Sequence, residues 1–107
     1  MFARRVSLDL RSKNNVAEFT EMFEKEVLPM LRKQKGFKDE LMFVQPGEIK
    51  AFGISLWDRR EDAELYGRET YPAVEKLLSK FIEGQARVAS YEVLHSTCHK
   101  IGAPVTV

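Results

Sequence analysis

Two histidines near the C-terminus, His95 and His99, are the side chains best suited to chemistry at neutral pH. We expect a strand from Ala86 to about His99, which would place both histidines on one face with Thr97 between them. Histidines at this spacing could bind a metal ion, but no third ligand is visible, because Cys98 points to the opposite face. The sequence therefore predicts no metal site here.

His95 is the candidate general base. It shares its strand face with Ala89, Tyr91 and Val93, a mostly apolar set. A partly buried histidine titrates near neutral pH, which suits proton transfer. The alternative is a histidine that forms hydrogen bonds within a subunit interface. On the same face, Tyr91 is a candidate wall of a ligand pocket.

Arg5 and Ser7 share the polar face of a strand expected over residues 2–10. If this face lines a cavity, Arg5 could hold an anionic or phenolate oxygen, with Ser7 beside the ligand. The alternative is an ion pair of Arg5 with Asp9 or Glu92 and contact with solvent.

Tyr66 and Tyr71 flank an expected break in a helical region. The residue before a proline avoids helical angles, so Tyr71-Pro72 interrupts the helix. Breaks of this kind can gate a pocket, and both tyrosines are candidate ligand contacts. The alternative is that both are packed aromatics with their hydroxyls at the surface.

Composition narrows the class of protein that carries these residues. The 107 residues fit one domain, and 44% are hydrophobic and 31% charged, as in ordinary globular proteins. A net charge of +1 gives no basic face for nucleic acid. We expect a cytoplasmic protein, because Cys98 has no partner for an intrachain disulfide, and neither a bilayer-spanning run nor a signal peptide is visible.

The first half of the chain reads as strand, helix and hairpin. Val6, Leu8 and Leu10 alternate with polar residues, as in a strand with one buried face. A helix follows to about residue 34, with Ser12 or Asn14 as its N-cap and Pro29 producing a kink near residue 25. Strands over 37–44 and 49–57, joined by a turn at 45–48, form a hairpin.

The second half reads as two helical segments and a strand. Asp58 can cap the next helix, with Glu61 completing a capping box, and Gly84 ends the segment after Pro72. A last strand of 86–99 would exceed its expected neighbour over 2–10 and leave unpaired backbone groups. A second subunit is the simplest cover for that edge. The order βαββαβ is the ferredoxin-like α+β arrangement, an antiparallel sheet with helices on one face.

Several segments resemble antibiotic-biosynthesis-monooxygenase-like domains of the dimeric α+β barrel superfamily. They are residues 35–37 (Lys-Gly-Phe), 55–63 (Ser-Leu-Trp-Asp-Arg-Arg-Glu-Asp-Ala), 71–74 (Tyr-Pro-Ala-Val) and 91–97 (Tyr-Glu-Val-Leu-His-Ser-Thr). The resemblance covers nearly the whole chain, 1–107, as one domain. It implies a homodimer whose sheets pack face to face, with a pocket for a small apolar or aromatic ligand in each subunit.

The resemblance also implies alternatives for function. One branch contains cofactor-independent monooxygenases acting on polycyclic aromatics, in which the substrate's own ring reacts with dioxygen; Trp57 matches a tryptophan that lines their pockets. Its alternative role is to seal the core at the end of a strand. The haem-degrading branch needs an Asn on the first strand and a Trp and His on the second helix; here Tyr66 stands near the Trp position and the other two are missing. A non-catalytic dimeric binding or stress-related module is the third possibility.

Overall fold

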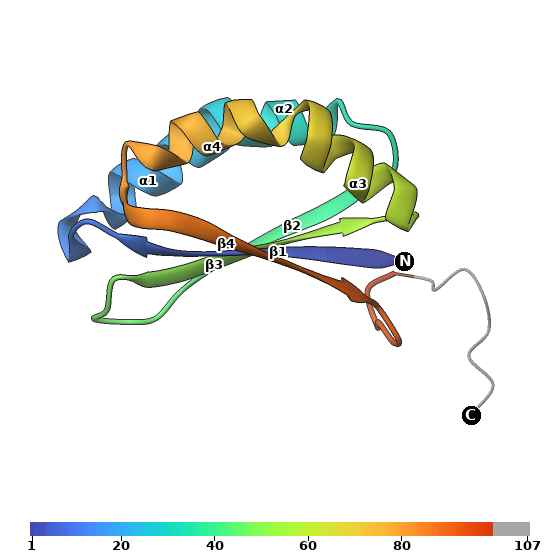
Figure 1. The fold of residues 1–107 in the computed structure, drawn as a ribbon. Coiled ribbons are helices and arrows are strands. Elements are labelled where there is room, and N and C mark those ends of the chain that lie inside the picture. The colour runs from blue at the N-terminus through green and yellow to red at the C-terminus, as the bar shows by residue number, and fades with distance from the viewer. Residues whose placement is uncertain (100–107) are drawn as a thin grey trace.

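A computed structural model describes residues 1–99 and has an α+β architecture (Figure 1). A four-stranded antiparallel sheet carries the helices of residues 1–99 on one face, and none of these helices covers its other face, called the open face below. The elements are β1 (Phe2–Leu10), a 3-10 turn (Lys13–Asn15), α1 (Val16–Met22), a π-helical turn (Phe23–Val27), α2 (Leu28–Arg32), β2 (Phe37–Val44), β3 (Lys50–Trp57), α3 (Arg60–Glu69), α4 (Tyr71–Ser79) and β4 (Ile82–Glu92). None of the helices within residues 1–99 is long and apolar enough to cross a bilayer.

The strand order β2-β3-β1-β4 confirms the predicted ferredoxin-like arrangement. Strand β1 lies between β3 and β4, and all three pairings are antiparallel. Its alternation is as predicted: Leu8 and Leu10 are buried against the helices. Arg5, Ser7 and Asp9 fall on the opposite face.

The first helical region widens where the kink near residue 25 was predicted. Ser12 caps its start, with its hydroxyl accepting a hydrogen bond from the Asn14 amide at 3.1 Å. Between α1 and α2 the backbone forms a π turn, in which the Leu28 N–H donates to the Phe23 carbonyl. Pro29 has no N–H to donate to the residue four positions earlier, so a regular helix would lose a hydrogen bond here.

The second helical region breaks at Tyr71-Pro72, as predicted, with α3 ending at Glu69 and α4 beginning at Tyr71. The predicted cap is wrong: Arg59 occupies the N-cap position, without a side-chain capping hydrogen bond. Asp58 instead forms an ion pair with Lys38 at 3.3 Å. Helix α3 begins at Arg60, so Asp58 stands one position before the N-cap residue.

The predicted boundaries of the last strand are wrong. β4 begins at Ile82, opposite Leu10, and ends at Glu92, opposite Phe2. Gly84 does not end α4; it lies inside β4 with a φ of 65°, where the pairing with β1 shifts register. Strand pairing stops at Glu92 because β1 begins at Phe2; beyond it the Val93 N–H still donates to the Met1 carbonyl at 3.0 Å. The length of the last strand therefore no longer argues for a second subunit.

Gly36 and Asp62 fix the junction between the first helical region and the sheet. Gly36 adopts a φ of 79°, which favours glycine. A Cβ at this position would lie 2.1 Å from the Asp62 Oδ2 atom. The Asp62 carboxylate is buried and forms an ion pair with Arg59 at 3.1 Å. The close approach fixes α3 against the start of β2.

Candidate functional site

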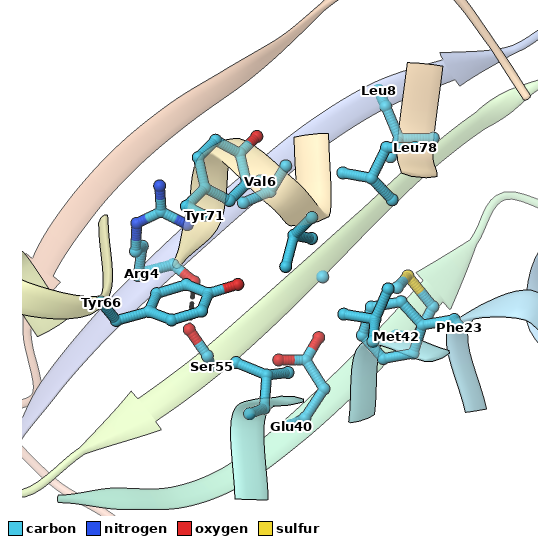
Figure 2. A pocket seen from close by; sticks show the side chains of 14 residues that line it. Arg4, Val6, Leu8, Phe23, Glu40, Met42, Ser55, Tyr66, Tyr71 and Leu78 are labelled. Carbon is cyan, nitrogen blue, oxygen red and sulfur yellow. Dashed lines mark hydrogen bonds between the residues drawn. The ribbon is translucent and has the colours of Figure 1, made fainter. Parts of the chain in front are cut away.

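A small cavity lies between the helix-covered face of the sheet and the helices (Figure 2). Its volume is about 30 Å³, which is room for one or two water molecules. Most of its wall is apolar, with a few polar side chains. The lining residues are Arg4, Val6, Leu8, Phe23, Val27, Leu31, Glu40, Met42, Gly53, Ser55, Tyr66, Tyr71, Val74 and Leu78.

Three of the polar side chains form one row across the sheet. Ser55 on β3 pairs with Arg4 on β1 and with Glu40 on β2. Directly paired residues project to the same face, so all three point toward the helices. Adjacent strands lie about 4.8 Å apart, which places the Arg4 and Glu40 backbones roughly 10 Å from each other. The row therefore sets a cation and a carboxyl on two sides of the cavity.

Arg4 is a buried cation without an anionic partner. Its side chain is 7% exposed, and its guanidinium carbon lies 4.0 Å from the centre of the Tyr71 ring and 5.2 Å from that of Tyr66. Within residues 1–99 it forms no ion pair and no side-chain hydrogen bond. Burial lowers the pKa of Arg4, but a guanidinium stays protonated at physiological pH.

Glu40 is the titratable group of the cavity. Burial raises its pKa to about 8; the neighbouring Asp39 charge adds to the increase and Arg4 opposes it. Gly53, next to it on β3, provides the space, because a Cβ there would lie 2.7 Å from the Glu40 Oε1 atom. Figure 2 shows the carboxyl directed into the cavity between Ser55 and Met42. At pH 7 the carboxyl is mostly protonated, and it becomes a base just above neutrality.

Tyr66 and Tyr71 are the two phenols in the cavity wall. Burial raises the pKa of both phenols, and the Arg4 charge opposes the increase. Both therefore remain neutral hydrogen-bond donors at neutral pH. The Tyr71 hydroxyl is buried and has no hydrogen-bond partner among the described residues. In Figure 2 the Tyr66 hydroxyl is directed toward the centre of the cavity.

Trp57 packs against residues that line the cavity. It is fully buried, with rings of Phe37 and Tyr66 at centroid distances of 5.6 Å and 5.1 Å. Its indole N–H donates to the Ser55 hydroxyl at 2.8 Å, and this hydroxyl in turn contacts the Arg4 carbonyl at 3.4 Å. Trp57 does not line the cavity; it positions Tyr66 and Ser55, which do.

The predicted site residues fall into separate places. Tyr66 and Tyr71 meet at the cavity. Arg5 and Ser7 lie on the open face of the sheet, where the Arg5 guanidinium stacks 4.2 Å from the Phe52 ring. Tyr91 pairs with Ala3 on that face and is 50% exposed.

The two histidines lie beyond the end of β4. His95 is exposed and outside any strand, so the predicted shared strand face does not exist. The His99 Nε2 atom lies 3.2 Å from the Asp39 Oδ2 atom. His95 and Arg5 therefore do not converge with the cavity residues. Within residues 1–99 no three His, Cys, Asp or Glu side chains are grouped to hold a metal ion.

Sequence reasoning missed Arg4, Glu40 and Ser55. The signal was strand alternation. Arg4 is in step with Val6 and Leu8, and Glu40 with Met42, so each charge stands on an otherwise apolar face.

This fold, with a largely apolar cavity between sheet and helices, is that of antibiotic biosynthesis monooxygenase domains. An antibiotic biosynthesis monooxygenase of known structure superposes with a TM-score of 0.67, at 11% identity over 89% of this chain and 100% of that one. A monooxygenase from the gene ActVA-Orf6 of Streptomyces coelicolor, in complex with Nanaomycin D, gives 0.76, at 13% identity over 89% of this chain and 88% of that one. SnoaB, a cofactor-independent oxygenase from Streptomyces nogalater, gives 0.72, at 10% identity over 92% and 97%. In sequence, no family model matches this chain, and no curated protein matches it significantly.

Proposed function

We propose that this protein is a cofactor-independent monooxygenase of a phenolic aromatic substrate, with Glu40 as the proton acceptor. The observation that carries the proposal is a carboxyl with a pKa of about 8 directed into a largely apolar cavity. A phenol has a pKa near 10 in water, so a carboxylate with this pKa is a much better matched base than an ordinary one. The likeness of fold to two oxygenases supports the same reaction class.

The reaction balances without an added reductant. Glu40 takes the phenolic proton, and the resulting electron-rich ring reduces dioxygen and forms a carbon–oxygen bond. Loss of water from the peroxide leaves a quinone, so that ArH(OH) and O₂ yield the quinone and H₂O. The substrate supplies all four electrons, and the protein supplies the base, a dry space and nearby donors to stabilise negative charge on oxygen.

Substrate entry requires movement of the helices. A cavity of about 30 Å³ does not hold an aromatic ring. Two irregular points border it: the π turn carries Phe23 and Val27, and the break between α3 and α4 lies between Tyr66 and Tyr71. Movement at these points would separate the helical layer from the sheet where the polar groups lie.

Oxygen uptake tests the proposal. With a panel of naphthols and hydroxylated anthracenes, an oxygen electrode should record consumption of one O₂ for each quinone formed, measured by its visible absorbance. Binding of panel members without any oxygen uptake would contradict the proposal and favour a non-catalytic binding module. A shift of the haem Soret band on titration would instead point to the haem branch.

We also propose that the protein is a homodimer joined through the open face of the sheet. That face carries the partly exposed side chains of Leu41, Phe43 and Tyr91, and the Phe43 ring stacks 4.7 Å from Phe52. Contiguous exposed apolar surface of this kind marks an interaction site.

Light scattering at micromolar concentration should give twice the chain mass of 12.4 kDa. A Leu41→Glu/Phe43→Glu double variant should give the monomer mass, because it buries two charges in the interface. A monomeric wild type would overturn the assembly. The control Leu65→Glu, on an exposed position of α3, should stay dimeric.

A further inference from the structure

We propose that Arg4 and Tyr71 form an anion subsite, so that the substrate is a hydroxyaryl carboxylic acid rather than a simple phenol. The role of the substrate hydroxyl rests on the proposed function. The anion subsite follows from unpaired groups in the cavity wall. It names the part of the ligand that the proposed reaction leaves undefined.

The first observation is a buried positive charge with no counter-charge. Arg4 is 7% exposed, and its closest compensation comes from the faces of Tyr66 and Tyr71; Glu40 and Glu75 act on it only from beyond ion-pair distance. Cation–π contact offsets only a small part of the cost of removing a cation from water. The acidic member of the row, Glu40, forms no ion pair with Arg4 among the described residues and is mostly neutral at pH 7.

The second observation is an unused donor on the residue whose ring covers this charge. The Tyr71 hydroxyl is buried and unpartnered, and Tyr71 is the ring that lies closest to the guanidinium. Guanidinium N–H and phenol O–H groups both donate to an oxyanion. The Arg4 and Tyr71 donors therefore lack a negatively charged hydrogen-bond acceptor. A ligand carboxylate would supply this acceptor.

The third observation is spacing. Arg4 and Glu40 stand in one row with Ser55 between them, so their backbones are roughly 10 Å apart. A planar ligand between their side chains would meet Arg4 with its carboxylate and Glu40 with its hydroxyl. The Tyr66 and Tyr71 rings offer aromatic surface beside the guanidinium for the ligand ring.

A pair of ligands that differ only in charge tests the subsite. Calorimetric titration at pH 7 without oxygen would compare a hydroxynaphthoic acid with its methyl ester. Wild type should bind the acid about tenfold or more tighter than the ester, as expected for a charge-assisted hydrogen-bonded contact. Arg4→Met should lose this preference while keeping its affinity for the ester, Arg4→Lys should keep part of it, and Tyr71→Phe should reduce it.

Arg32→Met is the matched control, because Arg32 is exposed in α2, outside both the cavity and the sheet, and should leave the preference unchanged. Equal binding of acid and ester by wild type would overturn the subsite, and this comparison needs no variant to fold. A preference that survives in folded Arg4→Met would overturn it as well. Oxygen uptake with esters alone would leave the proposed function intact and remove the subsite; acid-selective binding without uptake would do the reverse.

Discussion

Replacing Glu40 with Gln should lower kcat for oxygen uptake by roughly 10²–10⁴-fold, the usual contribution of a positioned general base. Gln keeps the shape of the side chain and the space provided by Gly53, but it cannot accept a proton. Ligand affinity should change little, since the substrate still fits between Arg4 and the β2 wall. Oxygen-electrode rates and a calorimetric titration of the same variant would separate the two effects.

The pH dependence of the wild type should carry the signature of this carboxyl. Because the pKa of Glu40 is raised to about 8 by burial, the basic form is a minor species at pH 7, and kcat/KM should rise through pH 8 to a plateau. Glu83→Gln, an identical change at an exposed position of β4, should keep the wild-type rate and profile. His95→Ala should do the same. Loss of turnover in His95→Ala with normal turnover in Glu40→Gln would reinstate His95 as the base.

The second large effect concerns stability. Glu40 titrates near 4.5 when unfolded and near 8 when folded, so between these values the native state binds more protons than the unfolded state. The contribution of Glu40 to the free energy of unfolding is therefore fully present below pH 4.5. This contribution is lost as the pH rises from 4.5 through 8. The loss between these limits is on the order of 3–5 kcal/mol.

Urea unfolding of wild type and Glu40→Gln at pH 5, 7 and 9 would isolate this contribution, because all other titrating groups are common to both. The two proteins should be similar in stability at pH 5, and the variant should be the more stable at pH 9. Parallel pH profiles would show that the Glu40 carboxyl is well solvated in the folded protein. The role as a tuned base would then be lost too.

The order of elements was readable because local signals and tertiary packing agree. Val6, Leu8 and Leu10 alternate along β1, and Pro29 disrupts the helix where its missing N–H requires it. The start of β4 could not be read in the same way. Phe81 and Ile82 continue the helical spacing of Leu77 and Leu78, and only the pairing with β1 shows that Ile82 is already in a strand.

The candidate site was less predictable, because its groups are buried by residues distant in sequence. Arg4 adjoins Arg5, and such a pair suggests surface until Tyr66 and Tyr71 cover one member of it. The half-buried Glu40 carboxyl fits in the cavity wall because β3 places Gly53 beside it. Tyr66 and Tyr71, which line the cavity, could be singled out from the sequence because a local break marks them. The prediction that His95 and His99 share a strand face is wrong, because β4 ends at Glu92.

The π turn has an angular consequence for the cavity wall. Phe19, Phe23, Val27 and Leu31 repeat every four residues, whereas a regular α-helix rotates about 100° per residue and so drifts about 40° at each such step. Over three steps the drift would be roughly 120°, enough to carry Leu31 off the side that Phe19 faces. The wider turn absorbs rotation midway, and Phe23, Val27 and Leu31 all border the same space. The π turn thus aligns the side chains along one wall of the cavity. This turn results from Pro29, which is not itself a residue of the wall.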